Sequence, residues 1–209
     1  MPYTEIITAF VTLFVIIDPI GLAPLFVGLT PRSTAKHHRS IAFRAVFIAF
    51  CILTLFGVFG DQVLTFAGIS MPAFRIAGGI LLFLTALEML FEKRSKRREE
   101  HAQHPEHQPV EDPSVFPLAT PLLAGPGAIT SMILLIDQSN GVVGALIIEA
   151  VLLSVLLIVL LFFLVSGFME KILGATGINV VTRIFGMLLA ALSVQFVIDG
   201  VRDVLTLSY

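Results

Sequence analysis

The run VFPLATPLLAGPGAITSMILLI (115–136) contains no charged residue and is long enough to cross a bilayer as a helix. Prolines remove backbone N–H donors from this run and glycines weaken its helix further. Non-helical backbone is tolerated at membrane depth only where protein covers it or water reaches it. The run therefore predicts a membrane span that is broken near its middle. The helix-breaking residues are Pro117, Pro121, Gly125, Pro126 and Gly127.

Composition places most of the chain in a bilayer. Of the 209 residues, 56% are hydrophobic and only 13% are charged, and the mean hydropathy is +0.96. A soluble domain carries closer to 25% charged residues. The formal net charge of −2 indicates no nucleic-acid partner, and the single cysteine, Cys51, excludes an intrachain disulfide.

Six apolar stretches predict six transmembrane helices, because each is continuous rather than alternating with a period of two residues. They cover residues 6–30, 41–60, 69–91, 115–136, 142–168 and 180–201. We therefore expect an all-α membrane protein.

Basic residues predict the orientation of the spans, since Lys and Arg collect in cytoplasmic loops. The loop after the first span, the insert at 92–114 and the connection before the sixth span carry nearly all of them. This predicts that both the N- and the C-terminus lie on the outside of the membrane. The insert also holds His101, His104 and His107, but Pro105 interrupts their helical spacing. We interpret it as a solvated cytoplasmic loop and predict no metal site.

The two halves of the chain repeat each other. DPIGLAP (18–24) and TPLLAGP (120–126) share a Pro-x₄-Pro spacing, and RIAGGILLFLT (75–85) matches RIFGMLLAALS (183–193) in the same order. Each half holds three spans, so the second copy must be inverted relative to the first. This predicts two inverted three-helix repeats, 1–91 and 115–209, with helices one and four broken. Such repeats are typical of secondary transporters with a site at the midplane.

The paired breaks are the predicted substrate site. N–H groups around Gly21, Gly125 and Gly127 would bind an anionic group, helped by the helix dipole. Asp18 would hold a substrate ammonium, a coupling ion or a proton, or would cap the second half-helix, and both roles can hold together. The predicted substrate-binding residues are Asp18, Pro19, Gly21, Pro24, Thr120, Pro121, Gly125, Pro126 and Gly127.

Three further charged residues lie within the spans. Arg75 and Arg183 would either pair with an acid across the bundle or extend to the membrane interface. Glu149, inside the fifth span, is a secondary candidate for proton coupling. The spans contain no nucleophile–base set, all five histidines lie in loops, and no phosphate-binding loop is present. We therefore expect no enzyme activity and no cofactor.

Four blocks resemble the MarC family of bacterial and archaeal membrane proteins, and the resemblance covers essentially the whole chain. They are DPIGLAPLFVGLT (18–30), ISMPAFRIAGG (69–79), PLATPLLAGPGAI (117–129) and RIFGMLLAALSVQFVIDGV (183–201). The family is similar to LysE-type exporters, and one branch is associated with cation-coupled transport of small neutral amino acids such as glycine and alanine. The resemblance implies the same class of function here.

The leading hypothesis is a secondary transporter of small neutral amino acids, coupled to H⁺ or Na⁺. The expected partners are the amino acid, the coupling ion and the lipid bilayer, and a homo-oligomer stays open. The alternatives are a membrane scaffold or regulatory protein without a substrate, and a passive channel.

Overall fold

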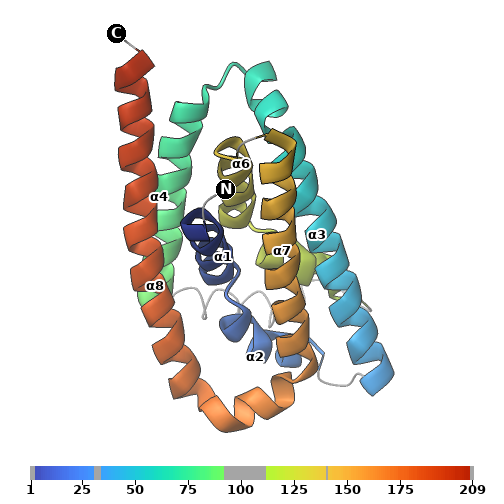
Figure 1. Ribbon diagram of the computed structural model, residues 1–209. Helices are drawn as coiled ribbons and strands as arrows, with labels where there is room; N and C mark the ends of the chain where they lie inside the picture. The colour runs from blue at the N-terminus through green and yellow to red at the C-terminus, as the bar shows by residue number, and fades with distance from the viewer. Residues whose placement is uncertain (1–2, 31–33, 92–111, 140, 208–209) are drawn as a thin grey trace.

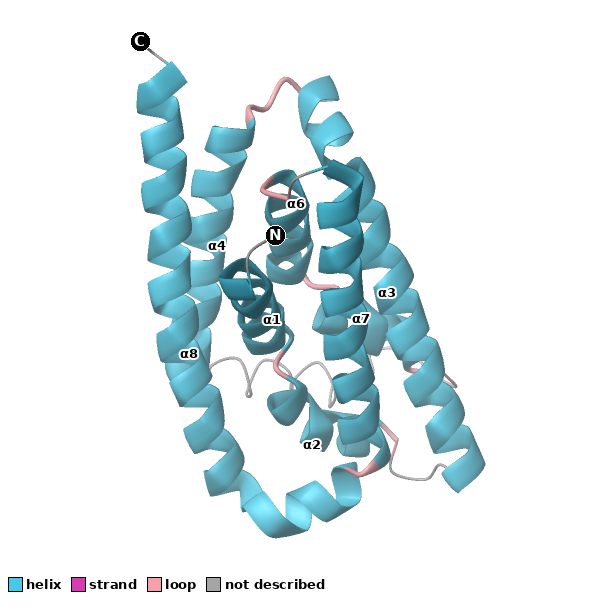
Figure 2. Ribbon diagram, viewed as in Figure 1, coloured by secondary structure: helices cyan, strands magenta, loops and turns pink. Residues whose placement is uncertain are grey.

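The computed structural model describes residues 3–30, 34–91, 112–139 and 141–207 as a bundle of helices (Figures 1 and 2). No strand occurs in these ranges, which confirms the all-α prediction. The histidine-containing insert lies almost wholly outside the described residues. The helices are α1 (Tyr3–Ile17), α2 (Pro19–Leu29), α3 (Ala35–Phe66), α4 (Met71–Leu90), η1 (Ser114–Leu123), α6 (Pro126–Asp137), α7 (Gly141–Leu164) and α8 (Ser166–Leu207).

Helix starts follow capping signals in the sequence. The Thr34 side chain accepts a hydrogen bond from the N–H of His37 at the start of α3. Ser70 accepts in the same way from the N–H of Ala73 at the start of α4. Hydroxyl side chains at this position satisfy N–H groups that have no partner inside the helix.

Five helices, or six with one bent pair, are long and apolar enough to cross a membrane. They correspond one by one to the six stretches expected from the sequence. Two of them are longer than predicted: the second span covers Lys36–Phe66 and the sixth Thr176–Thr206. The helix that carries the sixth span begins at Ser166 and changes direction at Gly174, whose φ is +58°.

Spans one and four are interrupted, as predicted. Asp18 separates α1 from α2. η1 and α6 meet at an angle of 57° across residues 124–125. The other spans are continuous helices within the described ranges.

The third and sixth spans pack side by side along their length (Figure 1). The pair is antiparallel, because Gly186 lies against Ala86 and Gly200 lies against Pro72. A Cβ atom at either glycine would come within 3.1 Å of the facing backbone oxygen. Small residues allow such close approach between membrane helices.

The interior and the surface have the polarity of a membrane protein. Helix α1 and its continuation α2 bury many of their apolar side chains, including Leu13, Ile17 and Phe26. In Figure 1, α1 and α6 lie inside a ring formed by α3, α4, α7 and α8. The ring exposes large apolar side chains over most of its length, for example Phe47 and Leu161. Soluble monomers rarely expose so much apolar surface, so this face is suited to lipid.

Candidate functional site

The break in the first span is organised by Asp18. Its backbone is left-handed, with φ +57° and ψ +65°, a conformation that Asp tolerates better than most residues. The N–H of Asp18 still donates to the Phe14 carbonyl at 3.0 Å, so α1 is helical up to this point. The carboxylate caps α2 by accepting a hydrogen bond from the N–H of Gly21 at 3.1 Å. Asp18 is 0% exposed, so a carboxylate is buried at this break.

Gly21 leaves room for that carboxylate. A Cβ atom at position 21 would lie 2.2 Å from Oδ2 of Asp18, which is far inside contact distance. The Gly21 N–H is engaged by Asp18 within the chain. In this structure it therefore donates to Asp18 rather than to a substrate anion, and the role of Gly21 in substrate binding stays a prediction.

The break in the fourth span is built differently. Phe116 and Thr120 have extended backbone angles inside η1, and the peptide bonds that precede Pro117 and Pro121 are cis. Gly125 then occupies the N-cap position of α6, and no side chain caps this helix. A Cβ atom at Gly125 would lie 2.6 Å from the Pro121 carbonyl oxygen, so the turn requires glycine.

The two helix starts therefore differ in charge. A buried carboxylate faces the start of α2, whereas the start of α6 has neither a side-chain cap nor an acidic residue in its first turn. The positive end of the α6 dipole and its first N–H groups are suited to an anion.

The two breaks come together in the fold. The Cγ2 atom of Ile16, two residues before Asp18, lies 3.5 Å from the Cβ position of Gly127. The Cδ2 atom of Leu82, from α4, lies 3.1 Å from the same position. Gly127 therefore lies in a narrow space between α1 and α4, one residue after Pro126.

Three other predicted site residues lie within the helices on either side of the breaks. Pro24 is inside α2, and Thr120 and Pro121 have exposed side chains on η1. The Pro-x₄-Pro spacing therefore does not mark equivalent positions: Pro19 begins α2, while Pro126 begins α6. The sequence comparison paired Pro19 with Pro121, and the helix starts pair it with Pro126.

An apolar hollow of about 320 Å³ lies beside the start of α6. It offers few polar groups for a charged solute, although it reaches Pro126. Its lining residues are Phe56, Gly60, Val63, Leu64, Phe74, Pro126, Ile129, Thr130 and Ile133.

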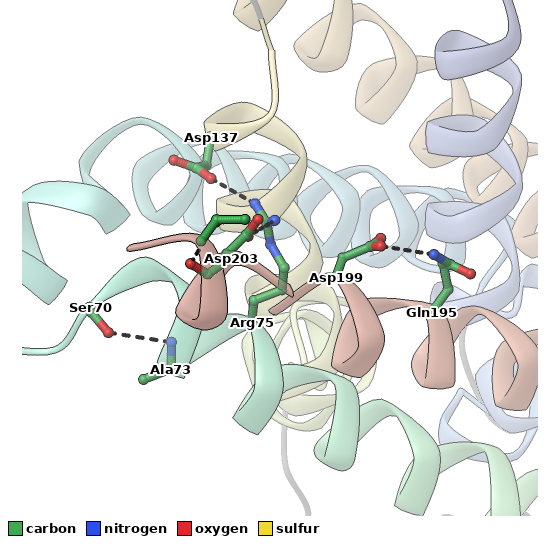
Figure 3. A network of polar contacts seen from close by, with 8 residues as sticks. Ser70, Ala73, Arg75, Asp137, Gln195, Asp199 and Asp203 are labelled. Carbon is green, nitrogen blue, oxygen red and sulfur yellow. Dashed lines mark hydrogen bonds and ion pairs between the residues drawn. The ribbon is translucent and has the colours of Figure 1, made fainter. Parts of the chain in front are cut away.

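Arg75 joins the ends of three helices (Figure 3). Its guanidinium on α4 donates to the carboxylate of Asp137 on α6 at 3.1 Å and to that of Asp203 on α8. The Arg75 side chain is only 12% exposed. Of the two alternatives from the sequence, the structure has the ion pair across the bundle. Arg183 is exposed near the opposite end of the antiparallel α4–α8 pair.

A second ion pair, between Arg44 and Asp112, joins α3 to the residue before η1. Sequence reasoning named neither this pair nor the two acidic partners of Arg75. These residues lie near the ends of apolar stretches, which is the one feature of the sequence that could have indicated them. The sequence does not show which of these ends lie next to each other in the fold.

Glu149 is a residue of α7 that faces α3, and it is partly buried. Its Oε2 atom accepts a hydrogen bond from the Thr54 hydroxyl at 2.7 Å. Its Oε1 atom is buried and has no partner among the described residues. Oε1 lies 3.6 Å from the Cβ position of Gly57, which also faces Met132 of α6. Met132 is about 7.5 Å along the helix axis from Gly127.

An all-helical bundle with five or six helices apolar enough to cross a membrane agrees with the family comparison, which finds an integral membrane protein. The model of the MarC family of integral membrane proteins matches residues 3–205. The chain belongs to the MarC family.

Proteins similar to this MarC chain occur in archaea and bacteria. A UPF0056 membrane protein of Archaeoglobus fulgidus is 40% identical over 196 residues, covering 93% of this chain and 91% of its own. One from Aquifex aeolicus is 37% identical, covering 95% and 93% of the two chains. The UPF0056 membrane protein YhcE of Escherichia coli is 33% identical, covering 93% and 91%. No solved structure matches the chain.

Proposed function

We propose that this MarC protein is a secondary transporter of small neutral amino acids such as glycine and alanine. The observation that carries the proposal is the contact of two interrupted spans, Ile16 against Gly127, close to the buried carboxylate of Asp18. Secondary transporters expose the ends of discontinuous helices to their substrates in this way.

The two helix starts are complementary to a zwitterion. The uncapped start of α6, at Gly125 and Gly127, would bind the substrate carboxylate through N–H groups and the helix dipole. Asp18 would bind the ammonium, because a buried carboxylate is stabilised by a cationic partner. Gly127 packs directly against Leu82 and Ile16, so a substrate bound at this helix start would have little room for a side chain.

Transport would be coupled to H⁺ or Na⁺ at a carboxylate inside the bundle. Asp18 is one candidate, since it can hold a proton or a cation when the ammonium is absent. Glu149 is the second candidate, because one of its carboxylate oxygens has no partner among the described residues. Both groups lie in or near the spans that contact α6.

Alternating access would follow from an inverted repeat. Matching the helix starts places Pro19 and Pro126 107 positions apart, and Arg75 and Arg183 are 108 positions apart. The near-constant offset supports equivalence of the two halves better than the proline spacing does. We also propose an inner-membrane location, by analogy with the MarC family, and both termini outside, on the distribution of basic residues.

The test is a reconstitution screen. Purified protein in proteoliposomes is loaded with one unlabelled amino acid at a time, and uptake of radiolabelled glycine or alanine is followed. Counterflow with wild-type protein and its loss in Asp18→Asn support the proposal. Flux without counterflow indicates a channel instead. No exchange of any amino acid by folded protein contradicts transport and favours a scaffold.

A further inference from the structure

Two hydroxyl groups are buried in the bundle without a hydrogen-bond partner among the described residues. They belong to Thr12 on α1 and Ser131 on α6, and both residues are 0% exposed. Ser and Thr in helices often bond back to a carbonyl of the preceding turn, as Ser154 and Ser193 do here. At Thr12 and Ser131 this internal bond is not made.

Helical register places the two hydroxyls on facing sides of α1 and α6. Thr12 precedes Ile16 by four residues, and Ser131 follows Gly127 by four, so each lies one turn from the Ile16–Gly127 contact on the same helix face. The next turn beyond each hydroxyl brings Thr8 near Leu135, since both line one hollow.

These contacts show that α1 and α6 run antiparallel along this interface. Positions closer to the N-terminus of α1 lie beside positions closer to the C-terminus of α6. Thr12 and Ser131 therefore lie at one level, between the helix breaks and the hollow.

The hollow has a volume of about 210 Å³ and a partly polar lining. It lies at the α6 end where Asp137 bonds Arg75, so it is at the same end of the bundle as the ion-paired cluster in Figure 3. Its lining residues are Thr4, Glu5, Thr8, Leu135, Gln138 and Ile148.

We propose that Thr12 and Ser131 form a polar subsite on an access path that runs from this hollow, between α1 and α6, to the helix breaks. The inference rests on the proposed transport function. Each hydroxyl donates one hydrogen bond and accepts others, so the pair binds either end of a small zwitterion. A buried hydroxyl without a partner is costly in a membrane, and a polar solute or its hydration water relieves that cost when it passes.

The first test measures the KM for labelled alanine in proteoliposomes. Thr12→Val and Ser131→Ala remove the hydroxyls at little change in volume. Each raises the KM about five- to tenfold, as expected for one lost hydrogen bond, while the melting temperature stays equal or rises. The matched control is Thr182→Val, which removes another buried hydroxyl without a partner among the described residues, outside this interface. An unchanged KM in both variants of the pair, with active wild type, overturns the subsite.

The second test does not depend on transport activity. Thr12→Cys in a Cys51→Ala background is exposed to a small hydrophilic thiol reagent. Faster modification of this variant than of Thr182→Cys in the same background supports a path that admits polar molecules. Equal, slow modification at both positions contradicts it. If the wild type moves no amino acid, the transport proposal fails, and this labelling result still decides whether the path exists.

Discussion

Ile16 of α1 and Gly127 of α6 are in contact, with the Cγ2 atom of Ile16 3.5 Å from the Cβ position of Gly127. These residues are 111 positions apart in the chain and each lies within two residues of a helix break. The contact makes one cluster out of two interruptions that would each be costly alone, because non-helical backbone at membrane depth must be covered or hydrated.

The charge and the cap of Asp18 can be separated by substitution. Asn also tolerates the left-handed backbone and offers a carbonyl oxygen to the Gly21 N–H, so Asp18→Asn preserves the helix start. We expect its melting temperature in detergent to stay close to that of the wild type, while transport is lost. Asp18→Ala should lose about 0.5–2 kcal/mol of stability as well. Equal destabilisation by both variants would refute the capping role.

Gly21→Ala is expected to act through Asp18. The new Cβ atom would lie 2.2 Å from Oδ2, so the carboxylate must rotate away from the cap. The stability loss should match that of Asp18→Ala, and the double variant should lose little more than either single one. A double-mutant cycle of melting measurements checks this. Strictly additive losses would show that the two residues act independently.

Replacement of Arg75 by Met should loosen the end of the bundle shown in Figure 3. The change leaves the carboxylates of Asp137 and Asp203 without their shared cation. Both are partly exposed, so water offsets part of the loss and we expect roughly 1–3 kcal/mol of destabilisation. The stability of Arg75→Lys should lie between that of the wild type and that of Arg75→Met. Lysine keeps the positive charge, but its single ammonium lacks the fork geometry of the guanidinium group.

The matched control for Arg75 is Arg202→Met, which removes an exposed arginine near the same end of α8. Thermal unfolding in detergent should show little change for this control. A loss at Arg202 as large as that at Arg75 would argue against a specific role for the three-helix ion pairs.

Glu149→Gln tests proton coupling. Gln retains an oxygen that accepts the Thr54 hydrogen bond, so the α3–α7 contact persists. We expect counterflow to continue and uptake driven by a proton gradient to be lost, because proton relays in transporters run through carboxylates within the spans. Thr54→Val keeps the carboxylate and should keep the driven uptake. Driven uptake that is unchanged in Glu149→Gln would exclude Glu149 from coupling.

Much of the fold was predictable because lipid imposes simple rules on sequence. Continuous apolar runs of sufficient length located the spans, and prolines marked spans one and four as broken. The position of each break was harder to predict. Pro24 is accommodated inside α2, whereas Pro126 begins α6, and the residue type is the same in both. Pro19 and Pro126 each follow a residue with non-helical backbone angles, Asp18 or Gly125, whereas Pro24 follows Ala23 inside α2.

The candidate site was predictable only in outline. Asp18 was identified because burying a carboxylate in an apolar span costs free energy, so such a residue usually has a functional or structural role. Thr12 and Ser131 gave no such signal, since most hydroxyls in helices bond to their own backbone. The partners of Arg75 depend on which helix ends meet in space, and Asp137 and Asp203 lie 62 and 128 positions away in the chain.

We propose that the two helix breaks form one substrate site. The most direct measurement is counterflow of labelled glycine or alanine in proteoliposomes containing Gly127→Leu, compared with Gly28→Leu. In Gly127→Leu even the Cβ atom would lie 3.1 Å from Leu82 and 3.5 Å from Ile16, so these side chains must shift and the new side chain occupies the junction of the two breaks, whereas a Cβ atom at Gly28 meets nothing within 4 Å. We predict folded protein in both cases, with counterflow abolished in Gly127→Leu and retained in Gly28→Leu. Wild-type counterflow in folded Gly127→Leu would contradict the account.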